Sequence, residues 1–151
     1  MKFKKDLIVW GPSIFWALLI FVGSSLPGAE FSSVGWVDFI LHSAAHATEF
    51  AVLSLLLYRA LQTDTSEKKK SFSEIWDLKF TVLIRKEFWI AFSATVIYAF
   101  LDELHQYFVP GRICSFWDFF FDSFGAFLGI YLYPFFVFAI DVLSKNKGQT
   151  H

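Results

Sequence analysis

The sequence predicts an all-α, polytopic membrane protein: a bundle of four transmembrane helices with both termini in the cytoplasm. Of the 151 residues, 56% are hydrophobic and 18% are charged, whereas about a quarter are charged in an ordinary soluble domain. The apolar residues form long blocks, which is typical of helices that cross a bilayer. The basic residues gather in alternate connections between these blocks. We therefore expect a single membrane domain over residues 1–151.

Four apolar blocks are long enough to cross a bilayer, which takes roughly 20 helical residues. The expected helices cover residues 7–23, 37–61, 88–108 and 116–140. A polar, lysine-rich loop over residues 62–87 separates the second helix from the third.

The distribution of lysine and arginine predicts the orientation. Apart from Arg112, these residues lie in the N-terminal segment, in or beside the loop 62–87, and in the C-terminal tail. We therefore expect those three segments in the cytoplasm and Arg112 outside. A cleaved signal peptide is the rival interpretation of the basic N-terminus. Pro27 and the lack of an A-x-A pattern disfavour it, and cleavage would leave three helices in the same orientation.

Polar residues in helices two to four are predicted to gather toward the outer leaflet. The candidate site residues are His46, Glu49, Asp102, Glu103, His105, Gln106, Asp118 and Asp122. At about 100° per residue, each helix carries its share on one face. A charge that faces lipid costs several kcal/mol, so these faces should turn toward one another. We expect a polar pocket that opens outward, with Arg112 above it.

The residue types in this pocket suit acid–base or metal chemistry, because burial shifts the proton affinities of carboxylates and imidazoles. His46 with Glu49, and Glu103 with His105, offer ligands for a divalent metal. The spacing is not a standard zinc signature, so the cofactor stays unknown. The planar guanidinium of Arg112 suits a phosphate or a carboxylate.

Two further features have simpler interpretations. Gly125 and Gly129 form a small-x-x-x-small pair that lets a neighbouring helix approach closely, and plain helix packing is the preferred interpretation. Asp118 could equally cap the last helix. The net charge of −1 gives no reason to expect a nucleic-acid partner.

Two stretches of the chain resemble the VanZ-like family of bacterial integral membrane proteins. These are HSAAHATEFAVLSLLLYRAL and FLDELHQYFVPGRICSFWDFFFDSFGAFLG. The residues that match the family pattern are His46, Glu49, Phe50, Asp102, Glu103, Gln106, Pro110, Gly111, Arg112, Asp118, Asp122 and Gly125. Phe50 stands where the family frequently has tyrosine, so no role for that hydroxyl is carried over.

The resemblance implies a multi-pass protein of the bacterial cytoplasmic membrane. The family's namesake is linked to low-level resistance to the glycopeptide teicoplanin. Membrane lipids are expected partners. A lipid-linked cell-wall precursor or a lipoglycopeptide is the more specific candidate.

Three functions stay open at this point. The first is binding of an anionic lipid or cell-wall precursor, with Arg112 holding the anionic group. The second is a membrane-embedded hydrolase or transferase that acts on a lipid-linked envelope substrate. Its general base would be Glu103 or Glu49, and His46 or His105 would serve as the acid or as a metal ligand. The third is a structural or partner-binding protein in which the polar residues lock the helices together.

Overall fold

The computed structural model describes residues 2–27, 33–62, 82–112 and 115–147, and these are all-helical, as predicted. The helices are α1 (Lys2–Ser24), α2 (Gly35–Gln62), α4 (Lys86–Gln106), α5 (Phe116–Tyr131) and α6 (Tyr133–Lys147). The ends of α2 and α4 agree with the predicted ranges to within two residues, whereas α1 begins five residues earlier than predicted. Most of the predicted basic loop, residues 63–81, lies outside the described residues.

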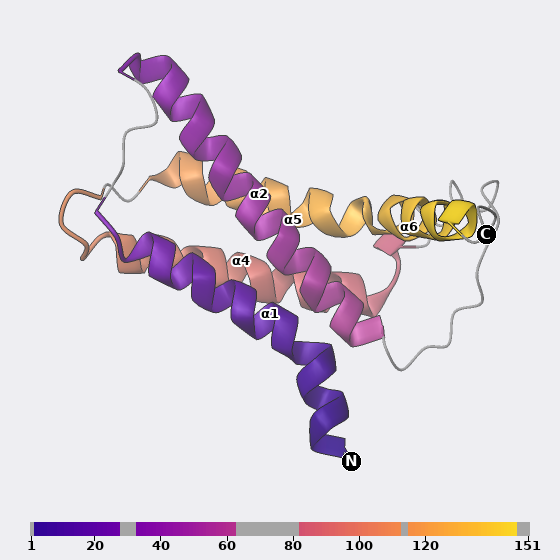
Figure 1. Cartoon of the computed structure of the whole chain (residues 1–151). Coiled ribbons are helices and arrows are strands. Elements are labelled where there is room, and N and C mark those ends of the chain that lie inside the picture. The colour runs from indigo at the N-terminus through magenta and orange to yellow at the C-terminus, as the bar shows by residue number, and fades with distance from the viewer. Residues whose placement is uncertain (1, 28–32, 63–81, 113–114, 148–151) are drawn as a thin grey trace.

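The helices alternate in direction. α1 and α4 lie side by side and run the same way, whereas α2 and α5 run the opposite way (Figure 1). α2 makes its most extensive contacts with α5 and also packs against α4 and α1. The ends of α1 and α4 therefore lie at the same end of the bundle as the starts of α2 and α5 (Figure 1).

The interior changes from apolar to polar along the bundle. One apolar cluster includes Tyr58, Phe88 and Ile130, and a second includes Phe50 and Ala99. Most of the buried polar residues occupy the other end, where α1 and α4 finish and α2 and α5 begin. They include Ser24, Ser43, His46, Asp102, Glu103, Gln106, Asp118 and Asp122. The predicted gathering of polar residues toward one end is thus observed.

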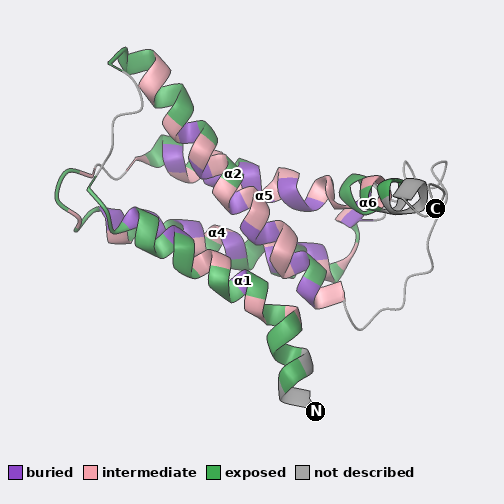
Figure 2. Cartoon of the chain, in the orientation of Figure 1, coloured by how far each residue is buried: buried purple, intermediate pink, exposed green. Residues whose placement is uncertain are grey.

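The outward faces of the helices are apolar and exposed, while the buried residues face the centre of the bundle (Figure 2). Ile8 and Phe116 are each 75% exposed. A soluble protein rarely presents so much contiguous apolar surface, whereas a bilayer accommodates it. By length and hydropathy, residues 6–24 of α1 and the whole of α2 could each cross a membrane, and α5 with α6 would add a third span if the pair forms one.

Among the described helices, α4 has 21 residues but is not apolar enough to be identified as a membrane span in the same way. Its inward face carries Thr95, Asp102, Glu103 and Gln106, all buried. Polar residues on that face lower the mean hydropathy without exposing charge to lipid. The arrangement of four spans therefore stays a prediction.

The structure divides the predicted helix over residues 116–140 into two. α5 ends at Tyr131, α6 begins at Tyr133, and their axes differ by 46°. Pro134 follows the break and has no backbone N–H with which to continue the helical hydrogen bonds. The backbone N–H groups of Phe135 and Phe136 both donate to Leu132 instead.

Gly125 and Gly129 bring α5 unusually close to α2. A Cβ atom on either glycine would overlap the backbone of α2, at Ala47 and Ala51 respectively. One turn further on, the Ser54 hydroxyl donates a hydrogen bond of 2.8 Å to the carbonyl oxygen of Ala126. The preferred interpretation of the glycine pair, close helix packing, is confirmed, and this contact positions the polar residues of α2 and α5 against one another.

Candidate functional site

Three buried side chains from three different helices meet at the polar end of the bundle. They are His46 of α2, Glu103 of α4 and Asp122 of α5. One nitrogen or oxygen atom from each lies within 4.8 Å of the other two. The Nδ1 atom of His46 is 3.6 Å from the Oδ1 atom of Asp122. The prediction that the polar faces of helices two, three and four turn toward one another is confirmed for these residues.

The local sequence explains why His46 and Asp122 face each other. Ser43, His46 and Phe50 form the buried stripe of α2 at helical spacing. On α5, Asp118, Asp122, Gly125 and Gly129 form the matching buried stripe. Because the two glycines allow close approach, Asp122, one turn before Gly125, is carried against α2.

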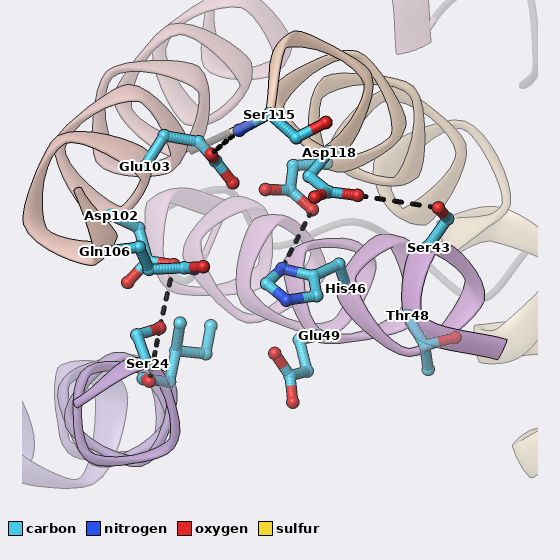
Figure 3. Close-up of polar contacts among 12 residues, drawn as sticks. Ser24, Ser43, His46, Thr48, Glu49, Asp102, Glu103, Gln106, Ser115 and Asp118 are labelled. Atoms are coloured by element: carbon cyan, nitrogen blue, oxygen red, sulfur yellow. Dashed lines mark hydrogen bonds and ion pairs between the residues drawn. The ribbon is translucent and has the colours of Figure 1, made fainter. Parts of the chain in front are cut away.

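Glu103 connects the end of α4 with the start of α5. Its Oε2 atom accepts a hydrogen bond of 2.9 Å from the backbone N–H of Ser115, which immediately precedes α5 (Figure 3). The first N–H groups of a helix lack intrahelical partners, and the positive end of the helix dipole favours an anion there. This contact fixes the Glu103 carboxylate beside the other two groups.

Asp118 lies one turn nearer the start of α5 than Asp122. Its Oδ1 atom is 3.5 Å from the Ser43 hydroxyl on α2, and both residues are buried. Asp118 is therefore a neighbour of the three-residue cluster, not a member of it. The alternative of a side-chain cap is not observed, since Ser115 is the N-cap residue and makes no side-chain cap hydrogen bond.

Asp102 and Gln106 face α1 instead of the cluster. The Oδ2 atom of Asp102 accepts hydrogen bonds of 2.8 Å from both the Ser24 hydroxyl and the Gln106 amide (Figure 3). All three residues are buried. This network joins the end of α1 to the end of α4.

His105 and Arg112 also contact the end of α1. The ring of His105 stacks on Phe21, and its Nε2 atom is 3.0 Å from the Ser25 hydroxyl. The guanidinium of Arg112 donates to the carbonyl oxygens of Gly23, at 2.9 Å, and Leu26, at 3.0 Å. Carbonyls at a helix C-terminus lack intrahelical donors, so a cation is favourable there. The anion-binding role of Arg112 stays a prediction.

The VanZ/LLP1 family matches this chain over residues 9–137. The chain belongs to the VanZ/LLP1 family. No curated protein and no solved structure matches it at a significant level. Every residue that carries the resemblance in the sequence lies inside the matched range.

Glu49 of this VanZ/LLP1 protein lies beside the cluster on the side that faces α1. It is half-buried and follows His46 by about one turn of α2 (Figure 3). It lines a pocket of about 530 Å³ between α1 and α2, together with Trp16, Ile20 and Thr48. The Trp16 indole N–H donates to the Glu49 carbonyl oxygen at 2.9 Å. A carboxylate thus borders an opening in the side of the bundle.

The sequence interpretation missed three serines of the VanZ/LLP1 site. Ser24, Ser43 and Ser115 each contact one of its carboxylates. Serine is common at helix ends and gives no distinctive pattern. Ser43 has the clearest signal, because it precedes His46 by three residues and therefore shares its face.

Proposed function

We propose that this VanZ/LLP1 protein acts on the polar headgroup of a lipid-linked envelope substrate, as a hydrolase or transferase embedded in the bacterial cytoplasmic membrane. The proposal includes four spans with both termini cytoplasmic and a site that opens toward the outer face. The observation that carries it is the burial of His46, Glu103 and Asp122 together. Groups of this kind are costly inside a membrane and are usually functional there.

The pocket between α1 and α2 supports a lipid substrate. It opens on the side of the bundle, where α1 and α2 present apolar residues such as Trp16 and Leu19. A headgroup could enter there from the bilayer while its chains stay in lipid. The first ionisable group that it meets is Glu49.

Glu49 is the proposed general base. A carboxylate at the mouth of a half-dry pocket can take a proton from an attacking water or acceptor hydroxyl. His46, the one group of the cluster that can carry positive charge, would face the negative charge that develops on the headgroup, and Glu49 would return its proton to the leaving oxygen. In this division of roles, Glu49 accepts the proton, and the cluster, centred on His46, binds the reacting group.

Binding without turnover is the second candidate function. Arg112 favours it, because its half-buried guanidinium lies at the end of the bundle that holds the polar site. An anionic lipid or a cell-wall precursor could replace the helix carbonyls as its partner. Any link to teicoplanin resistance would then follow from capture of such a ligand at the outer face.

The test is a reconstitution of the purified protein in nanodiscs. The probes are phosphatidylglycerol, cardiolipin and a polyprenyl-diphosphate-linked cell-wall precursor, and products are followed by mass spectrometry. We expect turnover of one probe by the wild type and at least a hundredfold less by Glu49→Gln. Glu87→Gln is the matched control, because Glu87 lies in the first turn of α4.

Each result separates the candidate functions. Saturable binding without turnover, weakened by Arg112→Ala, would replace the enzyme proposal with the binding candidate. Neither turnover nor binding, with variants that differ only in thermal stability, would favour a purely structural role for the polar residues.

A further inference from the structure

We infer that His46, Glu103 and Asp122 are the protein ligands of a divalent metal ion, either zinc or manganese. The inference deepens the proposed function and rests on the same site, because it names the cofactor that the site would hold. Its starting point is that one ligand atom from each residue lies within 4.8 Å of the other two.

Asp122 lies at ion-pair distance from His46, 3.6 Å, but makes no hydrogen bond within the described residues. The residue is 0% exposed, and neither carboxylate oxygen has a hydrogen bond there. The Nδ1 atom of His46, which faces this carboxylate, is also buried without a hydrogen bond. Buried polar groups are nearly always paired, and exceptions usually indicate a ligand, a water or an ion. With Nδ1 unprotonated, His46 would present its lone pair to the same buried region as the Asp122 carboxylate.

The separation of these two atoms fits a shared ion better than a direct hydrogen bond. The distance between His46 Nδ1 and Asp122 Oδ1 is 3.6 Å, which exceeds the usual hydrogen-bond range of about 2.7–3.2 Å. Ligand atoms about 2.1 Å from a tetrahedral zinc ion are about 3.4 Å apart. The two groups therefore lie near the spacing that a common metal ion requires, and the Glu103 ligand atom lies within 4.8 Å of both.

The Oε2 atom of Glu103 makes the kind of contact that orients a metal ligand. This atom accepts a hydrogen bond from the Ser115 N–H, which holds the carboxylate plane in position. Metal ligands are commonly fixed by such outer contacts. The cluster thus has ligands from three helices, one of which is fixed by the start of α5.

The chemistry of the ligands selects the class of ion. One imidazole and two carboxylates suit zinc or manganese, whereas magnesium and calcium favour oxygen ligands alone. The two carboxylates carry up to two negative charges in a buried place, and a divalent cation would neutralise them. Three protein ligands leave a fourth position for a water molecule or a substrate oxygen, as in catalytic zinc sites.

The distribution of the ligands over three helices explains why no metal signature appears in the sequence. Short motifs such as H-E-x-x-H place two ligands on one helix turn. Here His46, Glu103 and Asp122 come from α2, α4 and α5, and only the packing of these helices brings them together.

The experiment is elemental analysis of the full-length protein, purified in detergent with an affinity tag that contains no histidine. The wild type, His46→Ala, Glu103→Gln and Asp122→Asn are compared with His105→Ala as the matched control. His105 contacts Phe21 and Ser25 and lies outside the cluster. We expect stoichiometric zinc or manganese in the wild type and in His105→Ala, and at least a tenfold loss in the three cluster variants.

A second measurement covers the case in which a cluster variant folds poorly. Metal-stripped wild type is titrated with Co²⁺, which absorbs visible light strongly in a tetrahedral site, and with Zn²⁺ while the melting temperature is followed. Visible absorption bands and a rise in melting temperature in the wild type would support the site. Both should be absent in Asp122→Asn, provided that this variant elutes from a size-exclusion column like the wild type. A folded wild type that shows no bound metal, no bands and no thermal shift would overturn it, as would metal retained by all three cluster variants.

The metal inference and the proposed function can fail separately. Turnover by wild-type protein that elemental analysis shows to contain no metal would overturn the metal inference and leave the enzyme proposal standing. Stoichiometric metal bound by the three ligands, with no turnover or binding of any probe, would support the metal site and contradict the proposed function.

Discussion

The hydroxyl of Ser24, at the end of α1, donates a hydrogen bond of 2.8 Å to the carboxylate of Asp102 on α4, and both residues are buried. This contact joins the first helix to the helix that carries Glu103. Gln106 donates to the same carboxylate oxygen at 2.8 Å. Asp102 therefore joins α4 to α1, whereas the adjacent residue, Glu103, faces the cluster.

Ser24→Ala should destabilise the protein by about 1–3 kcal/mol, because it removes one donor from a buried carboxylate. Thermal unfolding in detergent measures the change. Ser25→Ala is the matched control, since the Ser25 hydroxyl is exposed and contacts His105 instead. Equal melting temperatures for the two variants would show that the hydrogen bond between Ser24 and Asp102 does not stabilise the protein.

Gly125→Ala should destabilise the bundle by about 1–3 kcal/mol, because the added methyl group meets the backbone of Ala47. In the same assay Gly23→Ala should be neutral or slightly stabilising, since a Cβ there meets nothing within 4 Å and alanine favours a helix. A Gly125→Ala variant as stable as Gly23→Ala would show that α2 and α5 do not approach as closely as described.

Arg112→Lys and Arg112→Ala should both lower the free energy of unfolding by about 1 kcal/mol. Neither side chain can make both hydrogen bonds that the guanidinium makes to the carbonyl oxygens of Gly23 and Leu26. The measurement is thermal unfolding without added lipid. If Arg112 acts instead through an anionic ligand, Arg112→Lys should keep much of the binding, and Arg112→Ala should lose it without a change in melting temperature.

Asp122→Asn should leave the metal-stripped protein at least as stable as the wild type, with a gain on the order of 1 kcal/mol, because it removes a buried carboxylate that makes no hydrogen bond. Added Zn²⁺ should then stabilise the wild type and not the variant, since ligand that binds only the folded state raises its stability. Calorimetry with and without Zn²⁺ measures both effects. A variant far less stable than the stripped wild type would point to a purely structural role for Asp122.

Fusions at the C-terminus should report a cytoplasmic location. Green fluorescent protein placed after the last residue should be fluorescent, and alkaline phosphatase at the same place should be inactive, because the basic residues hold these segments inside. Phosphatase placed after residue 112 should be active. The opposite pattern would overturn the orientation and the outward opening of the site.

Much of the fold followed from local patterns. Long apolar blocks predicted the helices, and the predicted ends of α2 and α4 were correct to within two residues, whereas α1 begins five residues earlier than predicted. The break at Leu132 was not predicted, although Pro134 was visible, because a proline in an apolar block can bend a helix without ending it. The matching polar stripes on α2 and α5 predicted that charged residues would meet.

The sequence by itself determined that this is a helical membrane protein of the VanZ/LLP1 family with its polar residues at one end, because composition, periodicity and motif are properties of the chain. Only the tertiary structure decided which of those residues share a buried centre. The close approach at Gly125 places Asp122 beside His46, and the packing at the end of α1 places Asp102 beside Ser24 and Arg112 beside the carbonyl of Gly23. Such pairings depend on contacts between helices far apart in the chain, which no local pattern specifies.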